Sequence, residues 1–217
     1  MHLVIGAQYA WGNIAPYIVG YFRDMGVQTN MSEMFAVLPV IVIISTLVFP
    51  IGTKLTAITG SKSVIWIGSN FCVVFTALAT QATSVEVFFL LYAVGFGVGK
   101  GFLYPAPLNA GWSHLPARKG FVSGVVVSGL GIGALSFGIL AKYILNPSNL
   151  EPTSYEVAPG VFEYEFPKEV NAKVPELLLV FCICWTILLS IGLLTVSNFE
   201  SPFAHLQSNL LQNEPAA

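Results

Sequence analysis

Residues 177–196 read LLLVFCICWTILLSIGLLTV and include no charged side chain. An α-helix rises about 1.5 Å per residue, so a helix of this length spans about 30 Å. That length equals the thickness of the hydrocarbon core of a bilayer. The stretch is therefore predicted to cross a membrane as a helix.

Five further apolar runs predict an all-α integral membrane protein, a six-transmembrane-helix bundle. The six expected spans are Leu3–Phe22, Met34–Pro50, Val64–Thr80, Val87–Pro107, Phe121–Ile144 and Leu177–Val196. We expect residues 1–200 to form this bundle, with a long acidic loop over 145–176. Residues 201–217 are expected to form an interfacial helix and a flexible tail.

The composition agrees with a membrane location. Hydrophobic residues make up 55% of the chain and charged residues 9%, with a mean hydropathy of +0.75. A soluble domain carries about 25% charged residues. The outside of this chain must therefore be largely covered by lipid. The net charge of −2 offers no basic surface for nucleic acid.

Nothing in the chain points to enzyme chemistry. The histidines are scattered, and no serine has a neighbouring histidine–carboxylate pattern. Cys72, Cys182 and Cys184 lie inside apolar runs, so we expect neither a disulfide nor a metal site. We therefore expect no catalytic residue, no metal and no cofactor.

The charge bias of the joints predicts the orientation. The second joint carries Lys54 and Lys62, and the fourth carries Arg118 and Lys119, without any acid. The loop over 145–176 holds six glutamates. By the positive-inside rule both termini face the cytoplasm, or the matrix of a mitochondrion. The plasma membrane and an organellar membrane, including the mitochondrial inner membrane, both remain open.

Lys100 falls deep inside an expected span, and Tyr104 follows one turn later. A charge within a bilayer is expensive and faces a cavity or a partner, unless its stem carries the ammonium to the interface. No acid in any span is available to pair with it. Snorkelling and contact with a bound anion are both open for Lys100.

The first span also carries polar side chains. Tyr9 and Asn13 are four residues apart and share one face of a helix. A face exposed to lipid would not keep an amide, so this face is expected to look into the bundle. Interhelical hydrogen bonding and ligand contact both fit it. Tyr9, Asn13, Lys100 and Tyr104 are therefore the candidate substrate-binding residues.

Glycines recur at intervals of four in the fifth span. Gly120 and Gly124 form one step, and Gly129 and Gly133 form another. Small residues at this spacing let two helix backbones approach closely in lipid. The pattern predicts tight helix packing, which occurs in any polytopic protein and in transporters whose helices rock.

Several stretches resemble the major facilitator superfamily: residues 9–12, residues 99–104, and the joint from Trp112 through Arg118 and Lys119 to Gly124. The branch they look most like is the oxalate:formate antiporter and monocarboxylate transporter-like group. The resemblance covers essentially the whole chain but only six of the family's usual twelve helices. It implies the N-terminal half of a transporter for small organic anions.

The resemblance also implies gating residues between the second and third spans. Gly52, Gly60 and Lys62 fit this region, but Ala57 and Ile58 stand where the family has an acid and an arginine. The first span lacks the charges that monocarboxylate transporters use for proton coupling. The half with the cations attributed to carboxylate binding is absent.

A lone half would expose a polar face to lipid, so a partner is expected: a second six-helix half, a second copy or a larger membrane complex. One hypothesis is transport of mono- or dicarboxylates, which Lys100 and the polar first span favour. A second is a transport-inactive, transporter-derived structural subunit, which the missing gating pair favours. A third is that the sequence is a piece of a longer chain.

Overall fold

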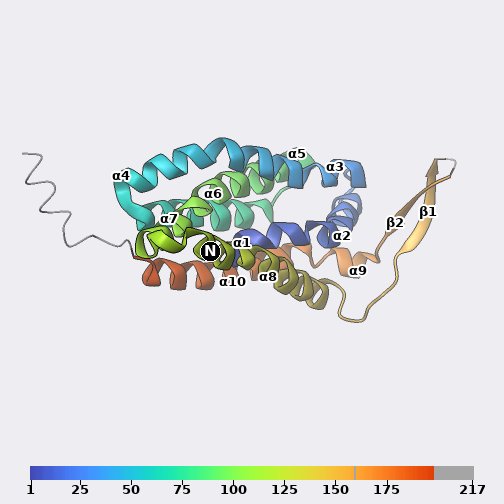
Figure 1. Ribbon diagram of the computed structural model, residues 1–217. Coiled ribbons are helices and arrows are strands. Elements are labelled where there is room, and N and C mark those ends of the chain that lie inside the picture. Colours follow the sequence, from blue (N-terminus) through green and yellow to red (C-terminus); the bar gives the residue numbers. More distant parts are fainter. Residues whose placement is uncertain (159, 198–217) are drawn as a thin grey trace, which may run out of the picture.

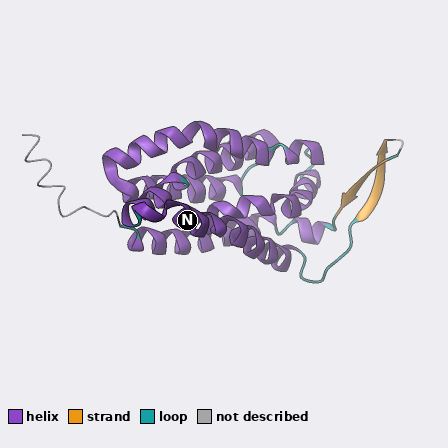
Figure 2. Ribbon diagram, viewed as in Figure 1, coloured by secondary structure: helices purple, strands orange, loops and turns teal. Residues whose placement is uncertain are grey.

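The computed structural model describes residues 1–158 and 160–197 (Figure 1). Helices dominate it, and the longer ones are α2 (Trp11–Asp24), α4 (Val37–Ala79), α6 (Gly95–Leu103), α7 (Pro105–His114), α8 (Lys119–Leu145) and α10 (Val174–Thr195). The shorter helical elements are α1 (His2–Gly6), η1 (Ala7–Ala10), α3 (Met31–Phe35), α5 (Val85–Phe88), η2 (Phe89–Val94), η3 (Pro116–Arg118) and α9 (Lys168–Asn171). Figure 2 shows the two strands, β1 (Thr153–Ala158) and β2 (Val161–Glu165), apart from the helices.

Four helical stretches are long and apolar enough to cross a membrane: Met31–Ala79, Val85–His114, Pro116–Leu145 and Lys168–Thr195. Large apolar side chains on them point outward without cover. Leu47 is 67% exposed and Leu194 is 81% exposed. Such surfaces need lipid in place of water. The chain is an integral membrane protein.

The expectation of six separate membrane helices is wrong for the described residues, which have four candidates. The expected spans Met34–Pro50 and Val64–Thr80 lie in the two parts of α4, because most of the joint between them is helical and the helix is interrupted at Gly60. Its hydroxyls, such as that of Thr56, donate to carbonyls of their own helix. The expected span Leu3–Phe22 is divided among α1, η1 and α2. The half major facilitator fold is therefore not what the structure contains.

Gly60 divides α4 into two arms, 37–59 and 61–79. A straight helix of 43 residues would be about 65 Å long, roughly twice the thickness of the bilayer core. Gly60 has φ 82° and ψ 162°, a conformation that glycine adopts without a steric penalty. Figure 1 shows α4 turning back at the end of the bundle that lies opposite the β1–β2 hairpin.

Helix α6 packs closely against both arms of α4, because it is built from alternating glycines. A Cβ on Gly97 would lie 2.9 Å from Cβ of Ile44 in the first arm. A Cβ on Gly99 would lie 2.7 Å from the carbonyl oxygen of Gly68 in the second arm. No side chain fits at either position. The two contacts fix the position of Lys100, the next residue.

Aromatic rings fill the centre of the bundle. Trp11 stacks on Tyr92 with ring centroids 5.2 Å apart, and Phe96 lies 6.0 Å beyond Tyr92. Trp185 of α10 continues the contact at 5.2 Å from Phe96. The Trp11 indole also donates a hydrogen bond to the Met34 carbonyl oxygen at 2.7 Å. This column joins α2, η2, α6 and α10.

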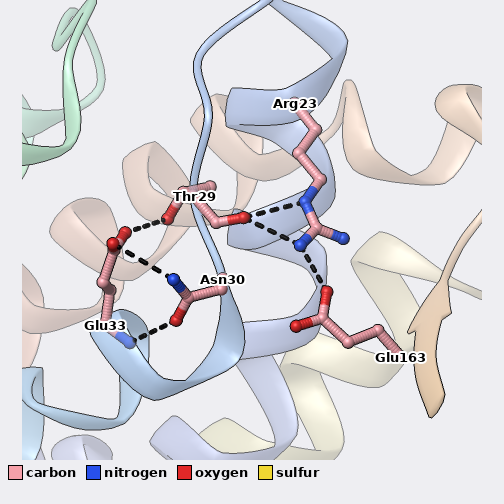
Figure 3. Close-up of polar contacts among 5 residues, drawn as sticks. All are labelled: Arg23, Thr29, Asn30, Glu33 and Glu163. Carbon is pink, nitrogen blue, oxygen red and sulfur yellow. Dashed lines mark hydrogen bonds and ion pairs between the residues drawn. The ribbon is translucent and has the colours of Figure 1, made fainter. Parts of the chain in front are cut away.

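The acidic loop over 145–176 contains the antiparallel β1–β2 hairpin, which projects from one end of the bundle (Figure 1). Arg23 of α2 forms an ion pair with Glu163 of β2, as Figure 3 shows. The same guanidinium donates to the Thr29 carbonyl oxygen at 2.9 Å and 2.8 Å. Glu33 then accepts from the Thr29 hydroxyl at 2.9 Å and from the Asn30 amide at 3.1 Å.

The expected interfacial helix and tail at 201–217 lie outside the described residues. The hairpin base is described and is held by further contacts. The Asn171 amide donates to the Asp24 carboxylate at 3.1 Å. Phe166 stacks on Tyr17 with ring centroids 4.2 Å apart. The loop is therefore attached to the end of α2 at several points.

Candidate functional site

A cavity of about 220 Å³ lies where η1 meets the first arm of α4 and helix α6. We call it the Lys100 cavity. It holds the space of roughly seven water molecules. Its walls combine one cation, two phenols, two hydroxyls and apolar groups, from Tyr9, Val42, Ser45, Thr46, Phe49, Lys100, Gly101 and Tyr104.

Lys100 is the charged group of this cavity and is only 6% exposed. Its Nζ lies 5.6 Å from the centre of the Tyr9 ring, within the range of a cation–π contact. No carboxylate of the described residues forms an ion pair with it. A buried ammonium without a counter-charge is costly, so an anion in the cavity would be stabilised.

The phenols of Tyr9 and Tyr104 are the remaining donors. Neither hydroxyl has a hydrogen-bond partner within the described part of the chain. The Tyr104 ring lies between those of His2 and Phe49, at centroid distances of 5.0 Å and 5.5 Å. Tyr9 is 48% exposed and stands at the mouth. One phenol is fixed in the wall, and the other is free to meet an incoming molecule.

Ser45 and Thr46 contribute oxygen lone pairs. Their hydroxyls donate to the carbonyl oxygen of Val42 at 3.0 Å and 2.8 Å. While those bonds hold, neither hydroxyl has a hydrogen left for an anion. The two oxygens keep lone pairs that can accept hydrogen bonds, and both residues line the same cavity as Lys100.

Breaks in the helices position the two tyrosines. Tyr9 lies on η1, a 3₁₀ turn between α1 and α2. A 3₁₀ turn has 3.0 residues per turn, so it rotates the side chain out of the α-helical register. Tyr104 ends α6, and Pro105, which has no amide hydrogen, begins α7. Irregular backbone at membrane depth is tolerated where it lines a cavity.

Three of the four candidate substrate-binding residues meet here. Tyr9, Lys100 and Tyr104 surround one cavity although 95 residues of sequence separate the first from the last. Asn13 does not reach it and instead lines a separate groove between α2 and α8. The turn of 3₁₀ helix at Tyr9 is the reason, because it breaks the shared face that a regular helix would give.

The residues expected to serve packing or gating fall into three groups. A Cβ would meet a neighbouring segment at Gly52 and Gly129, 2.8 Å from the Gly101 oxygen and 3.0 Å from Cβ of His2. At Gly133 it would meet the backbone of Leu3. Gly60 forms the bend of α4. The others are exposed at or near the joints: Lys62, Arg118, Lys119, Gly120 and Gly124.

Sequence reasoning missed the wall provided by α4. Val42, Ser45, Thr46 and Phe49 follow the spacing i, i+3, i+4, i+7 of one helix face. Two adjacent hydroxyls on that face of a membrane span were the available signal. Within the described residues, no group of three or more His, Cys, Asp or Glu side chains is placed to hold a metal ion. The donors present suit a carboxylate.

The chain is similar to two carriers of Toxoplasma gondii. It is 27% identical to apicoplast pyruvate carrier 1 over 233 residues, which covers 88% of this chain and 43% of that protein. It is 28% identical to apicoplast pyruvate carrier 2 over 130 residues, or 58% of this chain and 20% of that protein. The chain therefore spans less than half the length of either relative. No family model matches it.

These comparisons correct the family expected from the sequence. The resemblance was to the oxalate:formate antiporter and monocarboxylate transporter-like branch of the major facilitator superfamily, whereas the relatives are named pyruvate carriers. Glycines spaced by four and basic joints arise in polytopic proteins generally, because helix packing and membrane orientation favour them. Those patterns could not specify the family. The similarity that stands is to proteins named as carriers of pyruvate, a small monocarboxylate.

Proposed function

We propose that this chain is part of a carrier that moves a small monocarboxylate such as pyruvate across an organellar membrane. In this proposal Lys100 binds the carboxylate within the Lys100 cavity. The observation that carries it is a buried ammonium that faces a cavity and has no ion-pair partner among the described residues. The names of the two relatives support the same substrate class.

The cavity chemistry favours one carboxylate over two. Lys100 is the single cation of its lining, and the Tyr9 and Tyr104 phenols supply two neutral donors. Val42 and Phe49 form apolar wall on which a second carboxylate would lose its hydration without compensation. A methyl or short alkyl group suits that wall. The chain carries out no bond chemistry in this scheme and acts by binding and release.

The proposal includes a partner. Carriers commonly bind substrate between two sets of helices. A second copy or another chain would cover the open side of the cavity at Tyr9. The half-exposed phenol is the group that such a partner would enclose.

The test is binding of radiolabelled pyruvate to the purified chain in lipid nanodiscs. Lys100→Gln should weaken binding by about tenfold or more, because hydrogen bonds to charged groups contribute about 1.5–3 kcal/mol. The matched control is Lys54→Gln, an exposed lysine outside the cavity, which should bind like the parent. Succinate should compete less well than pyruvate.

Uptake into proteoliposomes then asks whether binding leads to transport. Equal binding by the parent and Lys100→Gln would overturn the role of Lys100. A parent chain that binds no pyruvate would instead support the transport-inactive subunit.

A further inference from the structure

A second hollow, which we call the outer groove, runs between α2 and α8 towards the loop that follows α8. Its volume is about 1120 Å³, roughly five times that of the Lys100 cavity. Helix α2 contributes Asn13 and Tyr17, and α8 contributes Gly138, Lys142 and Tyr143. A space of this size admits a small solute together with its water.

The lining of the outer groove has one sign of charge. Lys142 is the single charged residue among the described residues that line it. Amides and phenols, including Asn13, Asn146 and Tyr143, make up the neutral polar part. An ammonium surrounded by neutral polar groups attracts anions and repels cations.

Two acids at this end of α2 have partners of their own. The Asp24 carboxylate accepts a hydrogen bond from the Asn171 amide at 3.1 Å. Glu163 forms an ion pair with Arg23 (Figure 3). Lys142 itself forms no ion pair with any described residue.

Residues that line the outer groove and the Lys100 cavity lie close together along the chain. Asn13 Nδ2 lies 3.7 Å from the place that a Cβ on Gly138 would take, so the two helices meet there. Lys142 is one helical turn further along α8, about 6 Å towards the loop. Tyr9, at the mouth of the Lys100 cavity, is about one turn from Asn13 in the other direction. Asn13 of the outer groove and Tyr9 of the Lys100 cavity are therefore neighbours along the chain, although the 3₁₀ turn places them in separate hollows.

We infer that the outer groove is an entry site for a small carboxylate, which binds transiently at Lys142 and passes Asn13 to reach Lys100. This inference rests on the proposed function, because it assigns a route to the same anion. It gives the second lysine a separate role: Lys142 collects the anion, and Lys100 holds it.

The test uses Asn13→Cys as a reporter in nanodiscs of phosphatidylcholine. The labelling rates by a negatively charged and a neutral methanethiosulfonate reagent are compared, and labelling of the parent chain is subtracted. Adding Lys142→Gln should lower the ratio of charged to neutral rate about threefold, the factor for a unit charge about 6 Å away in water. Adding Lys168→Gln, an exposed lysine outside the groove, should leave the ratio unchanged.

Pyruvate should slow the labelling of Asn13→Cys. If that variant does not fold, Gly138→Cys is the second reporter, because its Cβ would have only ordinary contacts. An unchanged ratio in Lys142→Gln would overturn the entry site. So would protection by added phosphatidylglycerol and none by pyruvate, since a lipid headgroup would then be the occupant. Either result leaves the proposed binding of pyruvate at Lys100 unaffected. Equal pyruvate binding by the parent and Lys100→Gln would instead overturn the proposed function, whatever the labelling ratio.

Discussion

Lys100 and Lys142 are the same side chain in two opposite settings. Lys100 is 6% exposed, in a cavity of about 220 Å³ whose wall includes aromatic rings. Lys142 is exposed, in a groove of about 1120 Å³ with amides and phenols. A buried charge attracts an opposite charge strongly, because the surrounding dielectric constant is low. Water around an exposed charge reduces this attraction. The difference assigns tight binding to one lysine and capture to the other.

A glycine close to Lys100 in the chain and a glycine of the outer groove differ in the same way, and they give the largest expected effect. Gly97→Leu should destabilise the fold by about 1–3 kcal/mol or more, because its Cβ would already lie 2.9 Å from Ile44. Gly12→Leu should fold normally, since no atom lies within 4 Å of its Cβ position. Thermal unfolding monitored by size-exclusion chromatography compares the two. Equal melting temperatures would mean that α6 is not tightly seated.

The Tyr9 ring tests the Lys100 side of the comparison. Tyr9→Leu removes the phenol donor and the ring that contacts the Lys100 ammonium, and the loss of a neutral hydrogen bond should weaken pyruvate binding by about 0.5–1.5 kcal/mol or more, or roughly two- to twelvefold. Tyr9→Phe keeps the ring and loses only the hydroxyl, so it should fall between the parent and Tyr9→Leu. Equilibrium dialysis with labelled pyruvate measures all three. Leu and Phe variants of equal affinity would show that the ring face contributes nothing.

Ionic strength should separate the two lysines. The Debye length falls from about 30 Å at 0.01 M to about 3 Å at 1 M salt. The effect of Lys142→Gln on the labelling ratio should therefore shrink as salt is added. The effect of Lys100→Gln on pyruvate affinity should persist, because the ammonium is buried. If salt weakens both effects equally, the two lysines are equally exposed in solution.

The hairpin contact should have the smallest effect. Glu163→Gln removes the charge that pairs with Arg23, a part-buried interaction. A pair of this kind contributes about 0–1 kcal/mol, so cleavage of the hairpin by a protease should quicken only a few-fold. Glu156→Gln, on the exposed part of β1, is the control. Unchanged pyruvate binding in both variants would show that the hairpin takes no part in binding at the two lysines.

The membrane location and three residues of the Lys100 cavity were predictable from the sequence, because hydropathy and a charge within a span are local signals. Lys100 and Tyr104 are one turn apart, so their meeting was predictable. The helical conformation of the joint on both sides of Gly60 was not predictable, because a polar joint between two apolar runs looks like a loop. The 3₁₀ turn that separates Tyr9 from Asn13 also depends on contacts between distant helices.

The bend at Gly60 has a consequence for biogenesis. Because α4 precedes α6 in the chain, both of its arms are synthesised before the α6 glycines that pack against them. A segment carrying Lys100 is a poor candidate for insertion as a lone helix, since a central lysine costs about 2.5–3.5 kcal/mol on translocon scales. Helix α4, which is synthesised earlier, offers a protein surface against which this segment can pack as it enters the bilayer. The order of the helices along the chain is thus part of how the lysine is brought into the membrane.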